Sequence, residues 1–202
     1  MSAHFNDVDE KLLYSLRRVA LAMFRKNFFG IFHGSISARL TYESFVINSK
    51  QAVFDDLNPN NLISLNTQKD YRWHEASLDT PIHSQIYKTY KNAKFITYTM
   101  PPYTVSYSLK YSHLRPLDFF GQQILGEEVE IWDIGHYSSW YDRAPYEIAQ
   151  QITKNNKRFL IIKGYGIYAF DRDLHSLAKN IAIIENTCKI LHFNADLQSI
   201  HF

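Results

Sequence analysis

Asp79 and His83 are four positions apart, a spacing that can bring an acidic side chain and an imidazole together. Residues with this spacing lie on the same face of a helix, so the pair offers two possible ligands to a metal ion. A second interpretation is a histidine that faces the core and has only a structural role. Seven other histidines, from His33 to His201, show no ligand spacing.

The composition indicates one domain covering residues 1–202. A chain of 202 residues can bury roughly 70% of the surface that its unfolded form exposes, which is enough for an ordinary core. Cys188 is the only cysteine, so an intramolecular disulfide and a cysteine zinc cluster are excluded. It lies in an apolar helical run, where we expect a buried and unreactive thiol.

Charge and hydropathy exclude two further classes of partner. The net charge is +2, from 22 basic and 20 acidic residues spread along the chain, which gives no electrostatic footprint for nucleic acid. The first ten residues lack the pattern of a secretory signal, and no uncharged apolar stretch approaches the length of a membrane span. We therefore expect a cytoplasmic protein with no membrane or nucleic-acid partner.

The elements that must position these residues centre on one buried strand. Residues 95–99 (Phe-Ile-Thr-Tyr-Thr) are β-branched and aromatic, and Pro101-Pro102 ends the strand, because proline cannot continue a central strand. Residues 103–110 then have helical spacing, so the end of this strand lies where α/β folds place their chemistry.

The remaining elements follow from apolar spacing and from turn residues. Asn58 is placed as an N-cap with Pro59 at the first position of a short helical turn, and Thr80 is placed as the N-cap of a longer helix. Gly126 is expected to end a helix. The predicted helices are residues 9 to about 28, 80 onward, 117–125, 144–154 and 174–193, and the predicted strands are a hairpin within 28–49, then 63–65, 128–134 and 158–163.

Five segments resemble motifs of the class II aldolase/adducin family. They are residues 34–39 (Gly-Ser-Ile-Ser-Ala-Arg), 45–49, 56–62, 77–83 and 95–103. The resemblance implies a three-layer α/β sandwich with a central, mainly antiparallel sheet and helices on both faces. It also implies a homo-oligomer, because members of this family commonly form homotetramers.

The same resemblance implies that a zinc site has been lost. In the family's aldolases three histidines bind zinc, and their positions correspond here to Tyr98, Met100 and Tyr165. A neutral tyrosine with a pKa near ~10 is a poor zinc ligand, and a thioether is weak and soft. We therefore expect no metal cofactor and ordinary packing at these positions. An alternative is a site for a harder metal such as ferric iron, formed by Tyr98, Tyr165 and Asp79, the last matching the family's acid/base residue.

The family's phosphate pocket is better preserved. The resemblance assigns it to Ser35, Ser49, Lys50 and Ser77, with Leu78 in place of a second serine. Hydroxyls and backbone N–H groups near a turn suit an anion, and Lys50 adds a positive charge. The alternative is that the serines only cap turns and that Lys50 is solvated.

Two functions are consistent with these residues. The first is a catalytically degenerate member of the family, without the zinc site, that binds a small anionic ligand resembling a sugar phosphate, or a protein partner. The second is a sugar-phosphate aldolase or epimerase that uses Asp79 with an atypical metal or no metal. A Schiff base at Lys50 requires a desolvated lysine, which the sequence does not indicate. An aromatic cluster around Trp140 and Tyr141 is typical either of an interface or of ordinary packing.

Overall fold

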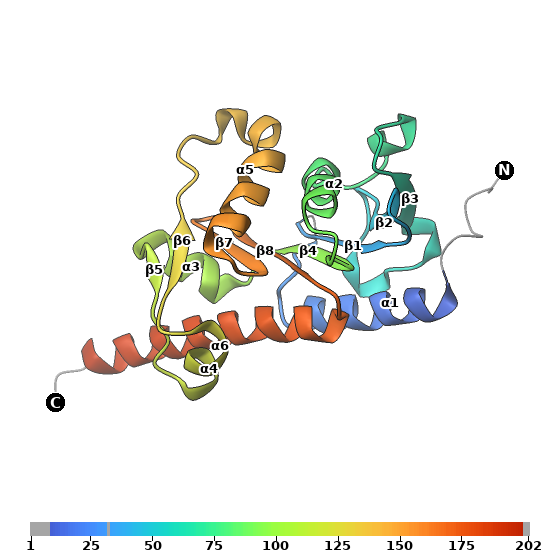
Figure 1. Cartoon of the computed structure of the whole chain (residues 1–202). Helices are drawn as coiled ribbons and strands as arrows, with labels where there is room; N and C mark the ends of the chain where they lie inside the picture. The colour runs from blue at the N-terminus through green and yellow to red at the C-terminus, as the bar shows by residue number, and fades with distance from the viewer. Residues whose placement is uncertain (1–8, 32, 200–202) are drawn as a thin grey trace.

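A computed structural model describes residues 9–31 and 33–199 of the chain (Figure 1). One eight-stranded sheet has the order β3-β2-β1-β4-β8-β7-β6-β5. Its strands are β1 (Ser35–Arg39), β2 (Ser44–Asn48), β3 (Leu62–Asn66), β4 (Phe95–Thr99), β5 (His113–Leu114), β6 (Val129–Trp132), β7 (Phe159–Ile162) and β8 (Gly166–Asp171). All neighbouring strands pair antiparallel except β6 and β7.

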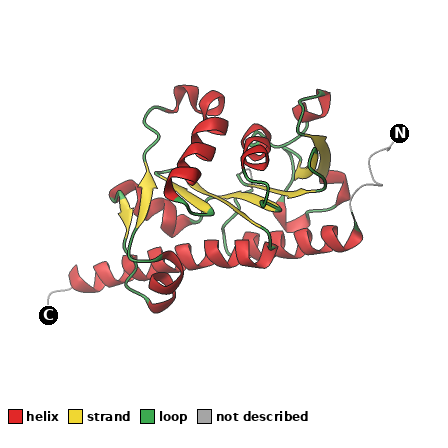
Figure 2. Ribbon diagram, viewed as in Figure 1, coloured by secondary structure: helices red, strands yellow, loops and turns green. Residues whose placement is uncertain are grey.

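Helices cover both faces of this sheet (Figure 2). The α-helices are α1 (Glu10–Arg25), α2 (Thr80–Thr89), α3 (Pro102–Lys110), α4 (Phe119–Leu125), α5 (Trp140–Asn155) and α6 (Leu174–Ser199). Helices α1 and α6 pack on one face, and α2 and α5 on the other, so that each face has its own apolar core. The predicted sandwich with a mainly antiparallel sheet is confirmed.

Strand β4 is the centre of the sheet, as its composition predicts. All five of its residues are buried, and it pairs with β1 on one side and β8 on the other. The register places Tyr98 of β4 opposite Ser35 of β1 and opposite Tyr168 of β8. A strand that is buried on both faces and paired at both edges fixes its side chains firmly.

The chain leaves β4 through the two prolines, also as predicted. Pro102 begins α3, and the buried carboxylate of Glu185 on α6 accepts hydrogen bonds from the backbone N–H groups of Tyr103 and Thr104 at 3.0 and 2.8 Å. A carboxylate here satisfies amides that have no partner within the helix and complements the helix dipole. This contact ties the end of β4 to the α6 layer.

Two predicted boundaries are wrong, and one strand was not predicted. The N-cap position of α2 is Asp79 rather than Thr80, because the Thr80 hydroxyl donates to the Ser77 carbonyl at 2.6 Å. Helix α5 begins at Trp140, four residues earlier than predicted, where the indole is buried at 3% exposure. Strand β8 was not predicted, since all six of its residues are buried and its sequence has no alternation.

Among the described helices, none combines the length and the apolar character that crossing a bilayer requires.

Candidate functional site

A cleft of about 500 Å³ opens at the end of the β1–β4 half of the sheet. Its walls come from the segment before β1, the end of β2 and the segment after it, the segment before α2, the end of β4 and the first turn of α5. The cleft therefore joins five separate segments of the sequence. Three predicted ligand-binding residues line it, namely Ser49, Lys50 and Ser77, and so does the predicted acid/base residue Asp79.

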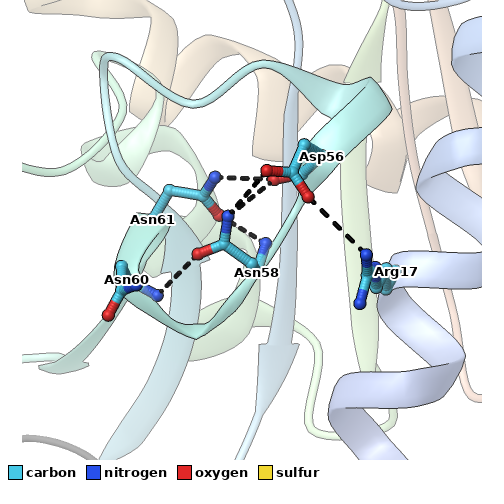
Figure 3. A network of polar contacts seen from close by, with 5 residues as sticks. All are labelled: Arg17, Asp56, Asn58, Asn60 and Asn61. Atoms are coloured by element: carbon cyan, nitrogen blue, oxygen red, sulfur yellow. Dashed lines mark hydrogen bonds and ion pairs between the residues drawn. The ribbon is translucent and has the colours of Figure 1, made fainter.

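The loop on one side of the cleft is held by a polar network (Figure 3). The Asn58 and Asn61 side-chain amides donate to the Asp56 backbone carbonyl at 3.0 and 2.9 Å, and Arg17 of α1 forms an ion pair with the Asp56 carboxylate at 3.6 Å. Asn58 also caps the following turn, as predicted. The network fixes the loop just after Phe54, whose buried ring forms part of the cleft wall.

Asp79 is buried, and both of its carboxylate oxygens are hydrogen bonded. Ser35 donates to one oxygen at 2.8 Å and Tyr168 donates to the other at 2.7 Å. Burial raises the pKa of the Asp79 carboxyl, although the bonds from Tyr168 and Ser35 oppose this shift. The carboxyl group is thus held in one orientation at the edge of the cleft by a hydrogen bond to each of its oxygens.

Behind Asp79 a chain of buried polar groups runs along α2 and β1. The Ser35 hydroxyl lies 2.9 Å from His83 Nε2, the Ser37 hydroxyl lies 2.7 Å from His83 Nδ1, and the Tyr87 hydroxyl lies 2.8 Å from that of Ser37. His83 is fully buried, and this burial lowers its pKa to about 3, so its imidazole is neutral at pH 7.

The donors in this chain can be assigned one after another. An ionised Asp79 only accepts hydrogen bonds, so Ser35 gives its proton to Asp79 and must accept from His83 Nε2–H. His83 Nδ1 then accepts from Ser37, which in turn accepts from Tyr87. With Asp79 ionised, every proton in the chain points toward the carboxylate, and His83 is in its Nε2–H tautomer.

Tyrosine rings fill the space around the end of β4. Tyr98 is 6% exposed, and its ring lies 4.8 Å from Tyr168 in a stacked arrangement and 4.8 Å from Tyr165 in a tilted one. Its hydroxyl donates to the Tyr165 backbone carbonyl at 2.9 Å. Burial raises the pKa values of Tyr98 and Tyr165, which keeps both phenols protonated. Met100 is half-buried and packs against the same apolar core.

Ser35 and Lys50, both predicted to hold an anion, occupy very different places. Ser35 is fully buried, and its hydroxyl is used by Asp79 and His83, so it is not brought to the cleft wall. Lys50 is exposed on the wall, and within the described part of the chain it forms no ion pair.

Backbone N–H groups near Lys50 already donate hydrogen bonds within the protein. The N–H groups of Ser49, Lys50 and Ser77 donate at 2.8–3.0 Å to other backbone carbonyls, those of Asn61, Glu75 and Asn48 respectively. A cradle of free backbone amides is therefore absent at these three positions. Of the predicted ligand residues, those whose side chains line the cleft are Ser49, Ser77 and Lys50, which offer two hydroxyls and an ammonium group to an anion.

Comparison with known proteins matches residues 15–192 to the profile of the Class II Aldolase and Adducin N-terminal domain. The chain belongs to this family. No curated protein sequence matches it. The family assignment confirms the one suggested by the sequence motifs. The matched residues include the whole sheet and helices α2 to α5, together with α1 apart from its first five residues and α6 apart from its last seven.

Solved structures of class II aldolases share this fold. The l-fuculose-1-phosphate aldolase from Thermus thermophilus superposes with a TM-score of 0.84 at 22% identity, over 96% of this chain and 99% of that chain. YgbL from Klebsiella pneumoniae, a putative aldolase/epimerase/decarboxylase, gives 0.75 at 15% identity over 91% and 89%. The sugar-phosphate aldolase from Thermotoga maritima gives 0.71 at 14% identity over 91% and 96%. At these identities the likeness concerns the fold.

The zinc ion of class II aldolases does not fit the residues present. Among residues 9–31 and 33–199 there is no group of three or more histidine, cysteine, aspartate or glutamate side chains placed to hold a metal ion. At two of the three corresponding positions stand protonated phenols, and the Tyr98 hydroxyl already donates to a carbonyl. Ferric iron binds phenolate, and the Tyr98 hydroxyl is instead engaged as a hydrogen-bond donor to the Tyr165 backbone carbonyl. Asp79 and His83 do not form a two-ligand seat, because the Ser35 hydroxyl lies between them.

Three members of the polar chain were missed from the sequence, namely Ser37, Tyr87 and Tyr168. Sequence spacing could have indicated two of them. Ser37 lies two residues after Ser35, on the same face of a strand. Tyr87 follows His83 by four residues, as His83 follows Asp79, so the three share one face of α2 and its N-cap position. No local signal points to Tyr168, since its contact with Asp79 spans 89 positions.

Proposed function

We propose that this class II aldolase/adducin-family protein binds a small anionic ligand of the phosphate-ester type and does not perform the family's zinc-dependent aldol or epimerase reaction. The observation that carries this proposal is the cleft in which Lys50, Ser49 and Ser77 meet Tyr98. The first three residues offer charge and hydroxyl donors, while Tyr98 stands where a metal ligand is expected from the resemblance.

Electrostatics support an anion at this place. Lys50 and His33 lie on the cleft wall, and among the described residues that line it Asp79 is the only acidic one. The raised pKa of Asp79 and its hydrogen bonds from two hydroxyls reduce its repulsion of an anion. A charge-assisted hydrogen bond to a phosphate is among the stronger polar contacts available to a protein. The names of two solved relatives, both aldolases of sugar phosphates, agree with this ligand class.

Calorimetric titration tests the proposal. We expect inorganic phosphate and l-fuculose 1-phosphate to bind, and Lys50→Met to weaken both about tenfold, the loss of one partly solvated charged contact. Lys91→Met, at an exposed lysine outside the cleft, is the matched control and should leave binding unchanged. Failure of both anions to bind, or equal binding by the wild type and Lys50→Met, would contradict the proposal.

A second candidate is a lyase or epimerase in which Asp79 acts as acid or base. One observation favours it, namely a carboxyl group of raised pKa that lines the same cleft as the proposed anion site. Turnover of l-fuculose 1-phosphate to an aldehyde by the wild type, lost in Asp79→Asn but with binding retained, would establish it. Binding without turnover leaves the first candidate.

We also propose that the protein assembles as a homo-oligomer, a homotetramer by resemblance to the family. Exposed apolar side chains on α4, namely Phe119, Phe120 and Ile124, support an interface, because such side chains are usually covered in an assembly. The alternative is that these side chains bind a different protein. Sedimentation velocity of the purified protein measures its oligomeric state. An oligomer would support the proposal, whereas a monomer would contradict it and favour a different partner.

A further inference from the structure

We infer that the ligand in this cleft carries a planar apolar ring next to its anionic group, so that it belongs to the class of small aryl phosphates rather than to the polyhydroxylated sugar phosphates. This inference rests on the proposed function and concerns the part of the ligand that Lys50 does not hold. It follows from which polar groups of the cleft are still available and from which apolar groups are exposed.

Three polar side chains of the cleft lining, Asn48, Asp79 and Tyr98, are hydrogen bonded within the protein. The Asn48 side chain accepts a hydrogen bond from one backbone N–H at 2.8 Å and donates to a backbone carbonyl at 3.0 Å. Both oxygens of Asp79 accept bonds from hydroxyls within the protein, and the Tyr98 hydroxyl donates to a carbonyl. Each of these groups has already used part of its hydrogen-bonding capacity within the protein, so a sugar chain regains fewer of the bonds it gives up to water than it would against unpaired groups, whereas an apolar ring has no such bonds to lose.

The same cleft exposes apolar side-chain surface, which cannot form the hydrogen bonds that the hydroxyls of a polyol need. Leu78, next to the proposed anion ligand Ser77, is 68% exposed, and Tyr141 in the first turn of α5 is 52% exposed. The Tyr141 phenol lies close enough to Tyr98 and Tyr165 to contribute to the raised pKa of each. Together Leu78, Tyr98 and Tyr141 form what we call the apolar wall.

The geometry of the two parts limits the size of the ligand. Ser77 and Leu78 are consecutive and both line the cleft, so a ring joined to phosphate through one oxygen is short enough to contact both residues. The cleft volume of about 500 Å³ falls within the range of sites for small molecules. Flat rings pack well against tyrosine, either stacked or edge to face.

Three probes titrated calorimetrically into the purified protein test this inference: inorganic phosphate, glycerol 3-phosphate and phenyl phosphate. We expect phenyl phosphate to bind about tenfold more tightly than glycerol 3-phosphate, as partial burial of one ring predicts. Leu78→Ser and Tyr141→Ser should each remove most of this advantage and leave the affinity for inorganic phosphate unchanged. Leu109→Ser and Tyr71→Ser, at exposed residues outside the cleft, are the matched controls.

The outcomes separate this inference from the function on which it rests. If phosphate and glycerol 3-phosphate bind and phenyl phosphate binds no more tightly, the inference of a ring in the ligand is overturned, while the proposed anion site is still supported. An advantage of phenyl phosphate that persists in Leu78→Ser and Tyr141→Ser also overturns the inference, because the ring then lies elsewhere. If none of the three probes binds, the proposed function itself fails.

Discussion

The buried His83 makes the stability of this protein depend on pH in a way that can be calculated. In the unfolded chain a histidine binds a proton near its ordinary pKa of 6.5, whereas in the folded protein burial lowers the pKa of His83 to about 3. Between these values the unfolded state holds more protons, so the free energy of unfolding falls as the pH falls. The contribution is complete above pH 6.5 and is lost progressively toward pH 3.

The size of the effect follows from the linkage relation. Well between the two pKa values each pH unit costs about 1.4 kcal/mol, which gives about 2 kcal/mol at pH 5 and about 4 kcal/mol at pH 3, where the folded-state ring is itself half protonated. Asp79 has the opposite effect on the free energy of unfolding. Because its pKa is raised in the folded protein, the folded state binds this proton at a higher pH than the unfolded state does, which favours folding as the pH falls. The effect of His83 must therefore be measured as a difference between two proteins that both keep Asp79.

Urea denaturation at pH 7.5 and pH 5.0, followed by tryptophan fluorescence, provides this difference. Between the two pH values we expect the wild type to lose about 2 kcal/mol more than His83→Gln, although the variant is less stable at both. His74→Gln, at an exposed histidine, should lose as much as the wild type. Equal losses in the wild type and His83→Gln would refute the reasoning. If His83→Gln does not fold, NMR titration of the wild-type ring decides, since its resonances should stay constant down to pH 4.5.

Two further predictions test the backbone and the polar chain. Gly166→Ala should destabilise the protein by about 4 kcal/mol in urea denaturation, because φ is +143° and a Cβ atom would lie 2.2 Å from the Thr99 carbonyl oxygen. Gly126→Ala, with φ +87° but no atom within 4 Å, should cost only about 2 kcal/mol, and equal losses would show that the contact is unimportant. Asp79→Asn should convert His83 from the Nε2–H to the Nδ1–H tautomer, because an amide nitrogen donates to Ser35 and reverses the chain. The ¹⁵N chemical shifts of the ring report the tautomer, and unchanged shifts would contradict the assignment of donors.

Much of the fold is encoded in local sequence patterns. The buried strand at residues 95–99, its exit through two prolines and the cap at Asn58 depend on backbone preferences of a few neighbouring residues, and the structure has each of them as predicted. The residue types at Tyr98, Met100 and Tyr165 are likewise read from the sequence. That these positions correspond to the zinc ligands of the family's aldolases is what the resemblance implies.

Only the tertiary structure decided which of these side chains meet and which are free. Ser35 was predicted to bind an anion, but the pairing of β1 with β4 turns its hydroxyl toward Asp79 and His83, 44 and 48 positions away. Tyr168 reaches Asp79 because β8 pairs with β4, and nothing in the neighbourhood of Tyr168 indicates that strand. The physical reason is that local patterns determine which face of an element is buried, whereas the partner of each buried polar group depends on sheet register and helix packing across the whole chain.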